Sequence, residues 1–367
     1  MRKLGSEGEG MKKRILFICG SKNQTTQMHQ IAMHLQEHDC AFTPYYVDGY
    51  CEWMRKVGWL DFTISGPRMA GLCVDYCEQH GLKVDYQGKE GNYDLVFTCI
   101  DVFVPKNVRQ SKLILVQEGM TDPENYLFWL AKTLKFLPRW IAGTSMNGLS
   151  LMYDRFCVAS EGYREFFIRK GSIADRIAVT GIPNFDDFAK FLQNDFPLSG
   201  YFLVCTNDLR ECKMYENRKK FIQRGVKLAG ERQLVFKIHP NEKLDRAKRE
   251  IEQYAPGALI YTEGSAEEMI ANCDGFLSHF STTTYVALTL GKEVHSDIPE
   301  EELRRLAPLQ HGQAAVKIAA VARELLEAEK APARDQSWNA KRRRLTSIGR
   351  LRAAWRLALG RVRISRG

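Results

Sequence analysis

LVFKIHP at residues 234–240 and GFLSHFSTTTYVAL at residues 275–288 are the two stretches that decide the fold. Each begins with a short, mostly apolar run of the length expected for a buried strand. The first run stops at Pro240, which cannot continue a sheet. The second run stops at four hydroxyl residues, 281–284, which open a helix. A helix start offers free backbone N–H groups and the positive end of the dipole, so the sequence predicts an anion site there.

Similar apolar runs alternate with helical segments along most of the chain. The predicted strands are residues 15–20, 93–98, 113–116, 154–160 and 177–181, followed by 201–206, 234–238, 258–261 and 275–278. Strands that alternate with helices predict parallel, doubly wound sheets. We therefore expect an α/β protein with two Rossmann-like domains, whose ligands would bind in the cleft between them.

The predicted domain limits follow from these segments. A chain of 367 residues is too long for one ordinary core. The sequence NDFPLSG at residues 194–200 is typical of a linker. The expected parts are a disordered N-terminus (1–12), an N-terminal domain (13–193), a C-terminal domain (200–325), a linker (326–340) and a basic amphipathic tail (341–367).

The net charge of +9 is a property of the tail. Residues 341–367 contain ten Lys or Arg and no acidic residue, and subtracting these ten charges from +9 leaves −1 for residues 1–340. The body of the protein is therefore nearly neutral. This balance argues against a broad nucleic-acid-binding surface, so nucleic acid is not an expected partner.

The tail has the pattern of an amphipathic helix. Its large apolar residues recur at steps of three or four, at Leu345, Ile348, Leu351, Trp355, Leu359 and Val362. A basic amphipathic helix with a Trp is typical of segments that bind anionic membrane surfaces. A nucleic-acid-binding arm and a helix that docks on a partner protein are the alternatives. We expect a cytoplasmic protein that is peripheral on the inner face of the cell membrane.

The ten cysteines indicate a reduced protein, because several lie in apolar strand-like runs where a thiol acts as a small hydrophobic group. Cys73, Cys77 and His80 could suggest a metal site, but their spacing suits one helix face and no second ligand pair follows. We expect no metal and no other cofactor.

His239 and the hydroxyl cluster are the first candidate site residues. His239 follows a buried strand, where an imidazole could contact a phosphate or act as acid or base; a structural His at a strand end is the alternative. The cluster could hold a diphosphate, whereas a plain N-cap needs only one hydroxyl. The cluster comprises Ser281, Thr282, Thr283 and Thr284.

Glu118 and Arg210 are the other candidates. Glu118 follows the strand at residues 113–116, where a carboxylate could serve as a general base; a solvated loop carboxylate is the alternative. Arg210 follows the first strand of the second domain and could hold a phosphate, unless it is an ordinary surface Arg. The aromatic stretch at residues 126–140 fits either a buried helix or a membrane-facing patch.

Taken together, these motifs resemble those of the GT-B glycosyltransferase fold. The sequence resembles the group that includes UDP-N-acetylglucosamine 2-epimerase, lipid-A-disaccharide synthase and the CDP-glycerol glycerophosphotransferases. The resemblance covers about residues 13–325. Its carriers are VASE (158–161), IAVTGIPNFD (177–186), KIHPNE (237–242), DGFLS (274–278) and STTT (281–284), with Ala287 and GK at 291–292.

The resemblance implies that His239, Ser281, Thr282 and Thr283 bind the phosphates of a nucleotide-sugar. The chain also departs from the group. GSKNQ at residues 20–24 replaces the Gly-Thr-Arg-Pro-Glu of the epimerases, and Glu118-Gly119 stands where the glycerophosphotransferases have His-Gly. Thr also replaces the two glycines of the epimerase Ser-Gly-Gly, without the acidic residues that follow it there.

The resemblance therefore favours a glycosyltransferase that acts at the cytoplasmic membrane face. It would move a sugar from a nucleotide-sugar to a lipid-linked or cell-surface glycan acceptor, with Glu118 and His239 as the expected catalytic residues. The alternatives are a nucleotide-sugar 2-epimerase or a glycerophosphotransferase of the same fold, and a non-catalytic binding protein.

Overall fold

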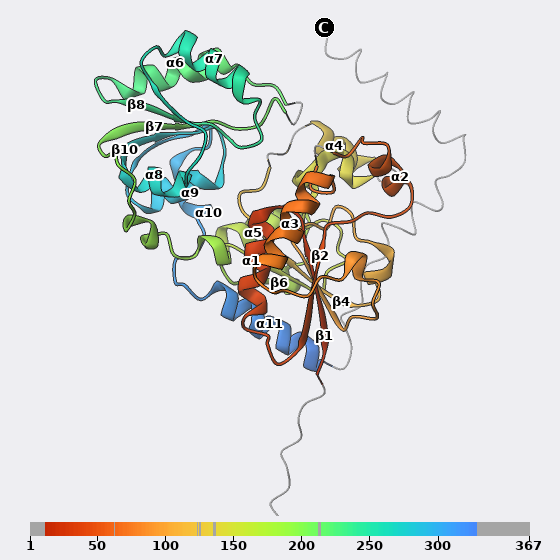
Figure 1. Cartoon of the computed structure of the whole chain (residues 1–367). Coiled ribbons are helices and arrows are strands. Elements are labelled where there is room, and N and C mark those ends of the chain that lie inside the picture. Colours follow the sequence, from red (N-terminus) through yellow and green to blue (C-terminus); the bar gives the residue numbers. More distant parts are fainter. Residues whose placement is uncertain are drawn as a thin grey trace, which may run out of the picture.

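The computed structural model describes residues 12–328, except residues 62, 123, 125, 135, 136, 212 and 213. Two parallel sheets, each with its own helices, form the two halves of the molecule (Figure 1). This arrangement confirms the predicted α/β fold with two Rossmann-like domains. The predicted disordered N-terminus lies almost wholly outside the described residues, and the basic tail lies entirely outside them.

The N-terminal sheet has six strands in the order β2-β1-β3-β4-β5-β6, all parallel. The order changes direction between β1 and β3, and ligands of open α/β sheets bind at such switch points. The strands are β1 (Arg14–Cys19), β2 (Asp39–Pro44), β3 (Leu95–Thr98), β4 (Lys112–Val116), β5 (Arg155–Val158) and β6 (Ile177–Val179).

The C-terminal sheet has five parallel strands in the order β11-β10-β7-β8-β9, so its switch point lies between β7 and β10. The strands are β7 (Tyr201–Cys205), β8 (Leu234–Lys237), β9 (Leu259–Tyr261), β10 (Cys273–Leu277) and β11 (Glu293–His295). Strand β7 lies between β8 and β10. The two stretches that decide the fold therefore end on either side of β7.

Helices cover both sheets. The α-helices of the first half are α1 (Lys22–Ala32), α2 (Tyr50–Lys56), α3 (Pro67–Gln79), α4 (Tyr126–Thr133) and α5 (Glu161–Lys170). Short 3₁₀ helices are η1 (Tyr86–Gly88), η2 (Lys106–Val108), η3 (Arg139–Met146), η4 (Ala174–Arg176), η5 (Pro183–Phe185) and η6 (Ala189–Leu192). The remaining α-helices are α6 (Arg218–Ala229), α7 (Leu244–Tyr254), α8 (Ala266–Asn272), α9 (Thr282–Thr289), α10 (Glu300–Leu306) and α11 (Ala314–Glu327). Helices α6 and α7 lie on one face of the second sheet, and α8 and α9 lie on the other (Figure 1).

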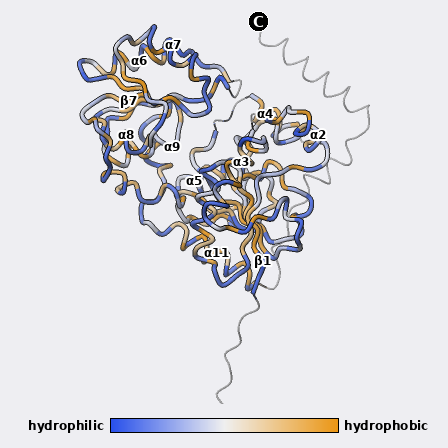
Figure 2. The backbone as a smooth tube through the Cα atoms, in the orientation of Figure 1, coloured by the Kyte–Doolittle hydropathy of each residue, from blue (hydrophilic) through white to orange (hydrophobic). Residues whose placement is uncertain are grey.

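Each sheet forms the apolar interior of its half (Figure 2). In the first half, Phe17 on β1 stacks between Phe42 on β2 and Phe97 on β3, and the ring centroids of the two pairs are 5.0 and 4.8 Å apart. Such stacked pairs add to the hydrophobic stabilisation that comes from burying the rings. The strand ends are therefore held on a rigid support, which is what a precise site requires.

Two strands were not predicted from the sequence. Strand β2 contains Asp39 and ends at Pro44, and β11 has only three residues. Both lie at or near a sheet edge, where fewer apolar residues are needed than in a central strand.

Helix α11 corrects the predicted domain limit at residue 325. The chain crosses back after α10, and α11 packs on α1 of the first half. The amine of Lys112, at the start of β4, donates to the carbonyls of Leu325 and Ala328 at 2.8 and 2.7 Å. Asp186 holds the returning segment by accepting from the backbone N–H of Ala314 at 2.7 Å. The two halves are therefore joined by two crossings, one near residues 180–200 and one near 307–313.

No helix of the described residues is long and apolar enough to cross a membrane.

Candidate functional site

Three strand ends of the C-terminal sheet are joined by side-chain hydrogen bonds. Thr206, directly after β7, accepts at its hydroxyl from the backbone N–H of His239, which follows β8, at 2.9 Å. Asn207 accepts from the hydroxyl of Ser278, after β10, at 3.2 Å, and donates to the carbonyl of Phe280 at 3.1 Å. His239 and the hydroxyl cluster thus follow β8 and β10, the two strands that flank β7 in the sheet.

His239 presents a partly exposed ring at this edge. Its Nδ1 accepts from the backbone N–H of Asn241 at 3.3 Å and lies 3.8 Å from a carboxylate oxygen of Asp208. The bond to Nδ1 favours the tautomer with its proton on Nε2. The ring is therefore oriented by its own loop, with an N–H available for a ligand.

The four hydroxyl residues 281–284 have separate tasks. Ser281 is the N-cap of α9 and accepts from the backbone N–H of Thr283 at 3.3 Å and from its hydroxyl at 2.9 Å. The hydroxyl of Thr282 accepts from the backbone N–H of Met120 at 3.0 Å. Thr284 is fully buried, and its hydroxyl has no hydrogen-bond partner among the described residues. Ser281 and Thr283 thus lie at the helix start, whereas the position of Thr284 does not support its predicted contact with a phosphate.

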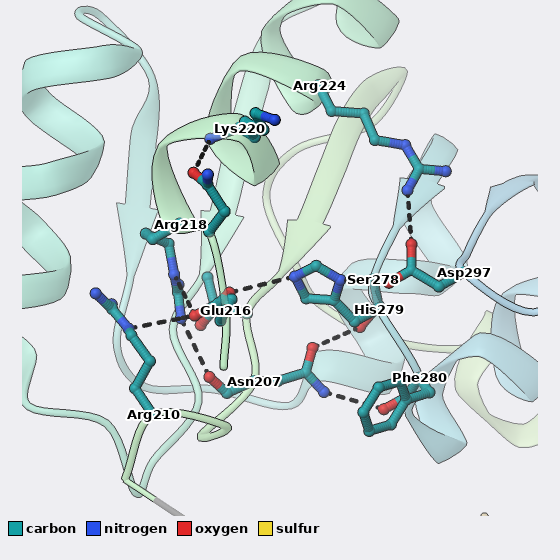
Figure 3. Close-up of polar contacts among 12 residues, drawn as sticks. Asn207, Arg210, Glu216, Arg218, Lys220, Arg224, Ser278, His279, Phe280 and Asp297 are labelled. Atoms are coloured by element: carbon teal, nitrogen blue, oxygen red, sulfur yellow. Dashed lines mark hydrogen bonds and ion pairs between the residues drawn. The ribbon is translucent and has the colours of Figure 1, made fainter. Parts of the chain in front are cut away.

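Arg210 is held in ion pairs. Its guanidinium donates to both carboxylate oxygens of Glu250, at 2.8 and 2.7 Å, and its Nε lies 3.2 Å from Glu216 (Figure 3 draws the pair with Glu216). The hydrogen bonds to Glu250 raise the pKa of Arg210 further. A bidentate pair of this kind is among the strongest side-chain contacts. The structure therefore gives Arg210 a role in holding its own loop, rather than the free position that phosphate binding would need.

A buried ionic cluster below this loop was not predicted. The side chains of Glu216, Arg218 and Glu242 are 0%, 3% and 0% exposed. Arg218 lies 2.9 Å from Glu216 and also donates to Glu242, which accepts in addition from Thr206. Burial raises the pKa of Glu242, whereas the pKa of Glu216 is lowered because bonds from His279 and Arg218 outweigh the effect of burial. Glu242 ends the motif KIHPNE, which is the one sequence signal that could have revealed the cluster.

His279 connects this cluster to the surface. Its ring stacks on Phe221 with centroids 4.0 Å apart, while Nε2 lies 3.3 Å from Glu216 and Nδ1 lies 2.6 Å from Asp297 (Figure 3). Burial alone would lower the pKa of His279, but the bonds to the two carboxylates raise it above its ordinary value. The imidazole of His279 therefore fastens the loop before α6 to the loop after β10.

Glu118 is held in the N-terminal half, two residues after the end of β4. Its carboxylate accepts from the hydroxyl of Ser21 at 2.8 Å, from the amide of Gln24 at 2.5 Å and from the amide of Asn23 at 3.4 Å. Ser21 is also the N-cap of α1, so the carboxylate lies at the N-terminus of that helix. These partners come from GSKNQ, the segment that departs from the epimerase pattern.

The two halves touch directly between Glu118 and α9. Met120 donates to Thr282 across the cleft, and the hydroxyls of Tyr163 and Tyr285 are 2.8 Å apart. A Cβ added at Gly119 would lie 2.5 Å from the hydroxyl of Thr282, so only glycine allows this approach. The loop that carries Glu118 therefore rests on the N-terminus of α9.

Asp122 is a further candidate in the same loop that sequence reasoning missed. Burial raises the pKa of Asp122, the carboxylate of Asp208 across the cleft raises it too, and a hydrogen bond from Thr144 opposes the shift. A carboxyl group with a raised pKa beside a cleft is suited to donate a proton.

Metal ligands are not gathered at this site. Within the part of the chain that the structure describes, no group of three or more His, Cys, Asp or Glu is placed to hold a metal ion. Cys73 and Cys77 are buried on α3 beside Cys19, inside the N-terminal core.

Comparisons with known proteins give structural matches. Neither a protein-family model nor a curated protein matches this sequence. A putative UDP-N-acetylglucosamine 2-epimerase from Listeria monocytogenes matches with a TM-score of 0.53 and 13% identity, over 89% of this chain and 99% of that one. UDP-GlcNAc 2-epimerase from Neisseria meningitidis, bound to UDP-GlcNAc, matches with a TM-score of 0.51 and 13% identity, over 85% and 100%.

The wall teichoic acid polymerase TagF, as its H444N variant, matches with a TM-score of 0.49 and 10% identity, over 86% of this chain and 89% of that one. The two epimerase matches cover 89% and 85% of this chain and therefore include residues of both sheets. The chain has the two-domain GT-B fold.

Proposed function

We propose that this protein is a nucleotide-sugar-dependent glycosyltransferase whose donor site is the edge formed by His239 and the start of α9. The observation that carries the proposal is the contact between the two halves: the helix start suited to a diphosphate touches the loop of Glu118. A donor bound at α9 would thus lie beside a carboxylate on the opposite wall of the cleft. That is the arrangement needed to activate an acceptor hydroxyl.

The chemistry of each residue follows from its position. The backbone N–H groups of the first turn of α9, with the hydroxyls of Ser281 and Thr283, would bind the phosphates and stabilise the charge of the departing nucleotide. His239 would donate from Nε2 to a phosphate oxygen. Glu118 would accept the proton of the acceptor hydroxyl as the hydroxyl attacks the sugar. Its neutral partners Ser21, Asn23 and Gln24 orient the carboxylate without neutralising it.

A lipid-linked or cell-surface glycan remains the proposed acceptor, with attachment to the inner membrane face through residues 341–367. The charge of ten Lys or Arg in this segment supports the proposal, because each basic residue near an anionic surface contributes about 1 kcal/mol.

Nucleotide-sugar 2-epimerase activity is the second candidate. It is favoured by the fold match to an epimerase bound to UDP-GlcNAc. The half-buried acid Asp122, whose pKa is raised by burial, would suit the proton transfers of an epimerisation. The two candidates differ in one requirement, because an epimerase converts its sugar without an acceptor.

A panel of nucleotides tests the proposal. UDP, CDP, GDP, TDP and CMP are each added to the protein, and the thermal midpoint is measured; a ligand at one hundred times Kd stabilises by about 2.7 kcal/mol. We expect one nucleotide to raise the midpoint. The corresponding nucleotide-sugar is then incubated alone and followed by NMR. Conversion without acceptor would support the epimerase, and no shift with any nucleotide would contradict both candidates.

A further inference from the structure

The N-terminal half carries a concentrated set of exposed aromatic and aliphatic side chains, which we call the aromatic face. Its members lie on α2, on the turn after α2, and on α4, and they are 42–77% exposed: Tyr50, Trp53, Val57, Trp59, Tyr126, Trp129 and Leu130. All three tryptophans that are exposed within the described residues belong to it. A concentration of this kind marks an interaction surface rather than the scattered apolar residues of an ordinary surface.

The aromatic face lies at the cleft edge of the sheet. Helix α2 follows β2 and α4 follows β4, so both come after carboxyl ends of parallel strands in one sheet. Strands β2 and β4 are three positions apart, which corresponds to about 14 Å at the usual strand spacing. Figure 1 shows both helices at the same end of the N-terminal half. The face therefore adjoins the loop that carries Glu118 and Asp122.

Its chemistry fits the interface of a lipid bilayer. Tyr50 stacks on Trp53 at 5.4 Å between centroids, and Trp53 meets Trp59 edge-on at 5.7 Å. The amine of Lys132 lies 5.2 Å from the ring of Trp129. Trp and Tyr with neighbouring Lys are the residues enriched at membrane–water interfaces, because their rings are apolar and their edges polar. The C-terminal half has no exposed Trp among its described residues.

The position of the tail agrees with a bilayer as the occupant. The described chain ends at Ala328, beside Lys112. Lys112 is the first residue of β4, so this point lies at the amino ends of the parallel strands, whereas the aromatic face follows their carboxyl ends. Twelve residues separate Ala328 from the basic segment that starts at Lys341, and the thirteen steps between these two residues, at about 3.3 Å each, span at most roughly 43 Å. A domain of this size is roughly 40 Å across. The basic segment can thus reach the plane of the aromatic face.

We propose that the aromatic face binds an anionic lipid bilayer and turns the acceptor side of the cleft toward it. The inference rests on the proposed function. It adds a second membrane contact besides the tail and gives the N-terminal half a defined orientation on the membrane. A lipid-linked acceptor could then reach Glu118 without leaving the surface. The tail supplies charge, and the face supplies the aromatic anchors that fix the orientation.

The test uses the full chain and vesicles of phosphatidylcholine with or without phosphatidylglycerol. The variant carries Trp53→Ser, Trp59→Ser and Trp129→Ser. A matched control carries three serines at exposed apolar positions of the C-terminal half, Val226→Ser, Leu244→Ser and Leu259→Ser. The partition coefficient is measured by cosedimentation. Quenching of Trp fluorescence by brominated lipid is measured with Trp338 and Trp355 replaced by Phe in the wild type and in the variant, so that it reports whether the indoles of the aromatic face enter the bilayer, and the thermal midpoint reports folding.

We expect the tryptophan variant to lose at least tenfold in partition coefficient on anionic vesicles and the control at most twofold, with strong quenching in the wild type. Equal binding of variant and wild type would overturn the inference and leave attachment to the tail alone. Loss of binding without quenching in the wild type would also overturn it, because the face would then hold the tail. If the loss is seen but no nucleotide binds, the surface stands and the proposed function fails.

Discussion

The two walls of the cleft are built in different ways. On the C-terminal wall, buried ions hold the loops: Arg218 joins Glu216 and Glu242, and His279 joins Glu216 to Asp297. On the N-terminal wall, neutral hydroxyl and amide groups hold the single carboxylate of Glu118. The first wall is therefore suited to present a fixed surface to a charged ligand. The second orients the proposed catalytic carboxylate. The difference teaches that the two halves hold their loops by different means, buried ion pairs in one and neutral hydrogen bonds in the other.

Removing the central cation of the C-terminal wall should have the largest effect. Arg218→Met leaves Glu216 and Glu242 buried without their shared partner, which costs about 3–5 kcal/mol. Urea unfolding followed by circular dichroism measures the loss. Arg224→Met is the matched control, because Arg224 forms an exposed pair with Asp297 that is worth at most about 1 kcal/mol. Equal losses of free energy of unfolding in both variants would show that the buried cluster stabilises the protein no more than the exposed ion pair does.

The contact between the two walls should show coupling. Gly119→Ala forces its new methyl group against Thr282, whereas Thr282→Ala removes the obstruction together with the bond to Met120. We expect the double variant to lose less free energy of unfolding than the two single variants lose together. The difference between these losses is the coupling energy, which should be about 0.5–3 kcal/mol. Urea midpoints of the three variants give this value. Strict additivity would mean that the walls do not meet in solution.

The pH dependence of stability tests the ionic contacts of the C-terminal wall. The raised pKa of His279 means that its contribution is fully present below its ordinary value of 6.5 and is lost as the pH rises through the folded value. The lowered pKa of Glu216 acts in the opposite direction, since its contribution is lost as the pH falls through that lowered value. We expect the thermal midpoint to fall as the pH is raised from 6 to 8, and His279→Gln to flatten this fall. If the thermal midpoint of the variant falls with pH as steeply as that of the wild type, His279 does not cause the pH dependence.

Sequence periodicity was enough for the fold because each central strand is a continuous apolar run, as in Tyr201–Cys205. It also brought His239 and Ser281 to one edge, since parallel strands place their carboxyl ends together. It could not reveal what Arg210 binds, because Glu250 is forty residues away and many charged residues are nearer in sequence. The return of α11 to the first half was hidden for the same reason: it depends on Lys112, more than two hundred residues earlier.

Direct titration tests the central claim that a nucleotide binds at the start of α9. The nucleotide selected by the thermal panel is titrated calorimetrically into the wild type, Ser281→Ala and Thr289→Ala. Both variants remove a hydroxyl from the same helix, but Thr289 is exposed at the far end. We predict that Ser281→Ala weakens binding at least fivefold and that Thr289→Ala leaves it unchanged. Equal affinities in all three proteins would contradict the assignment of the donor site.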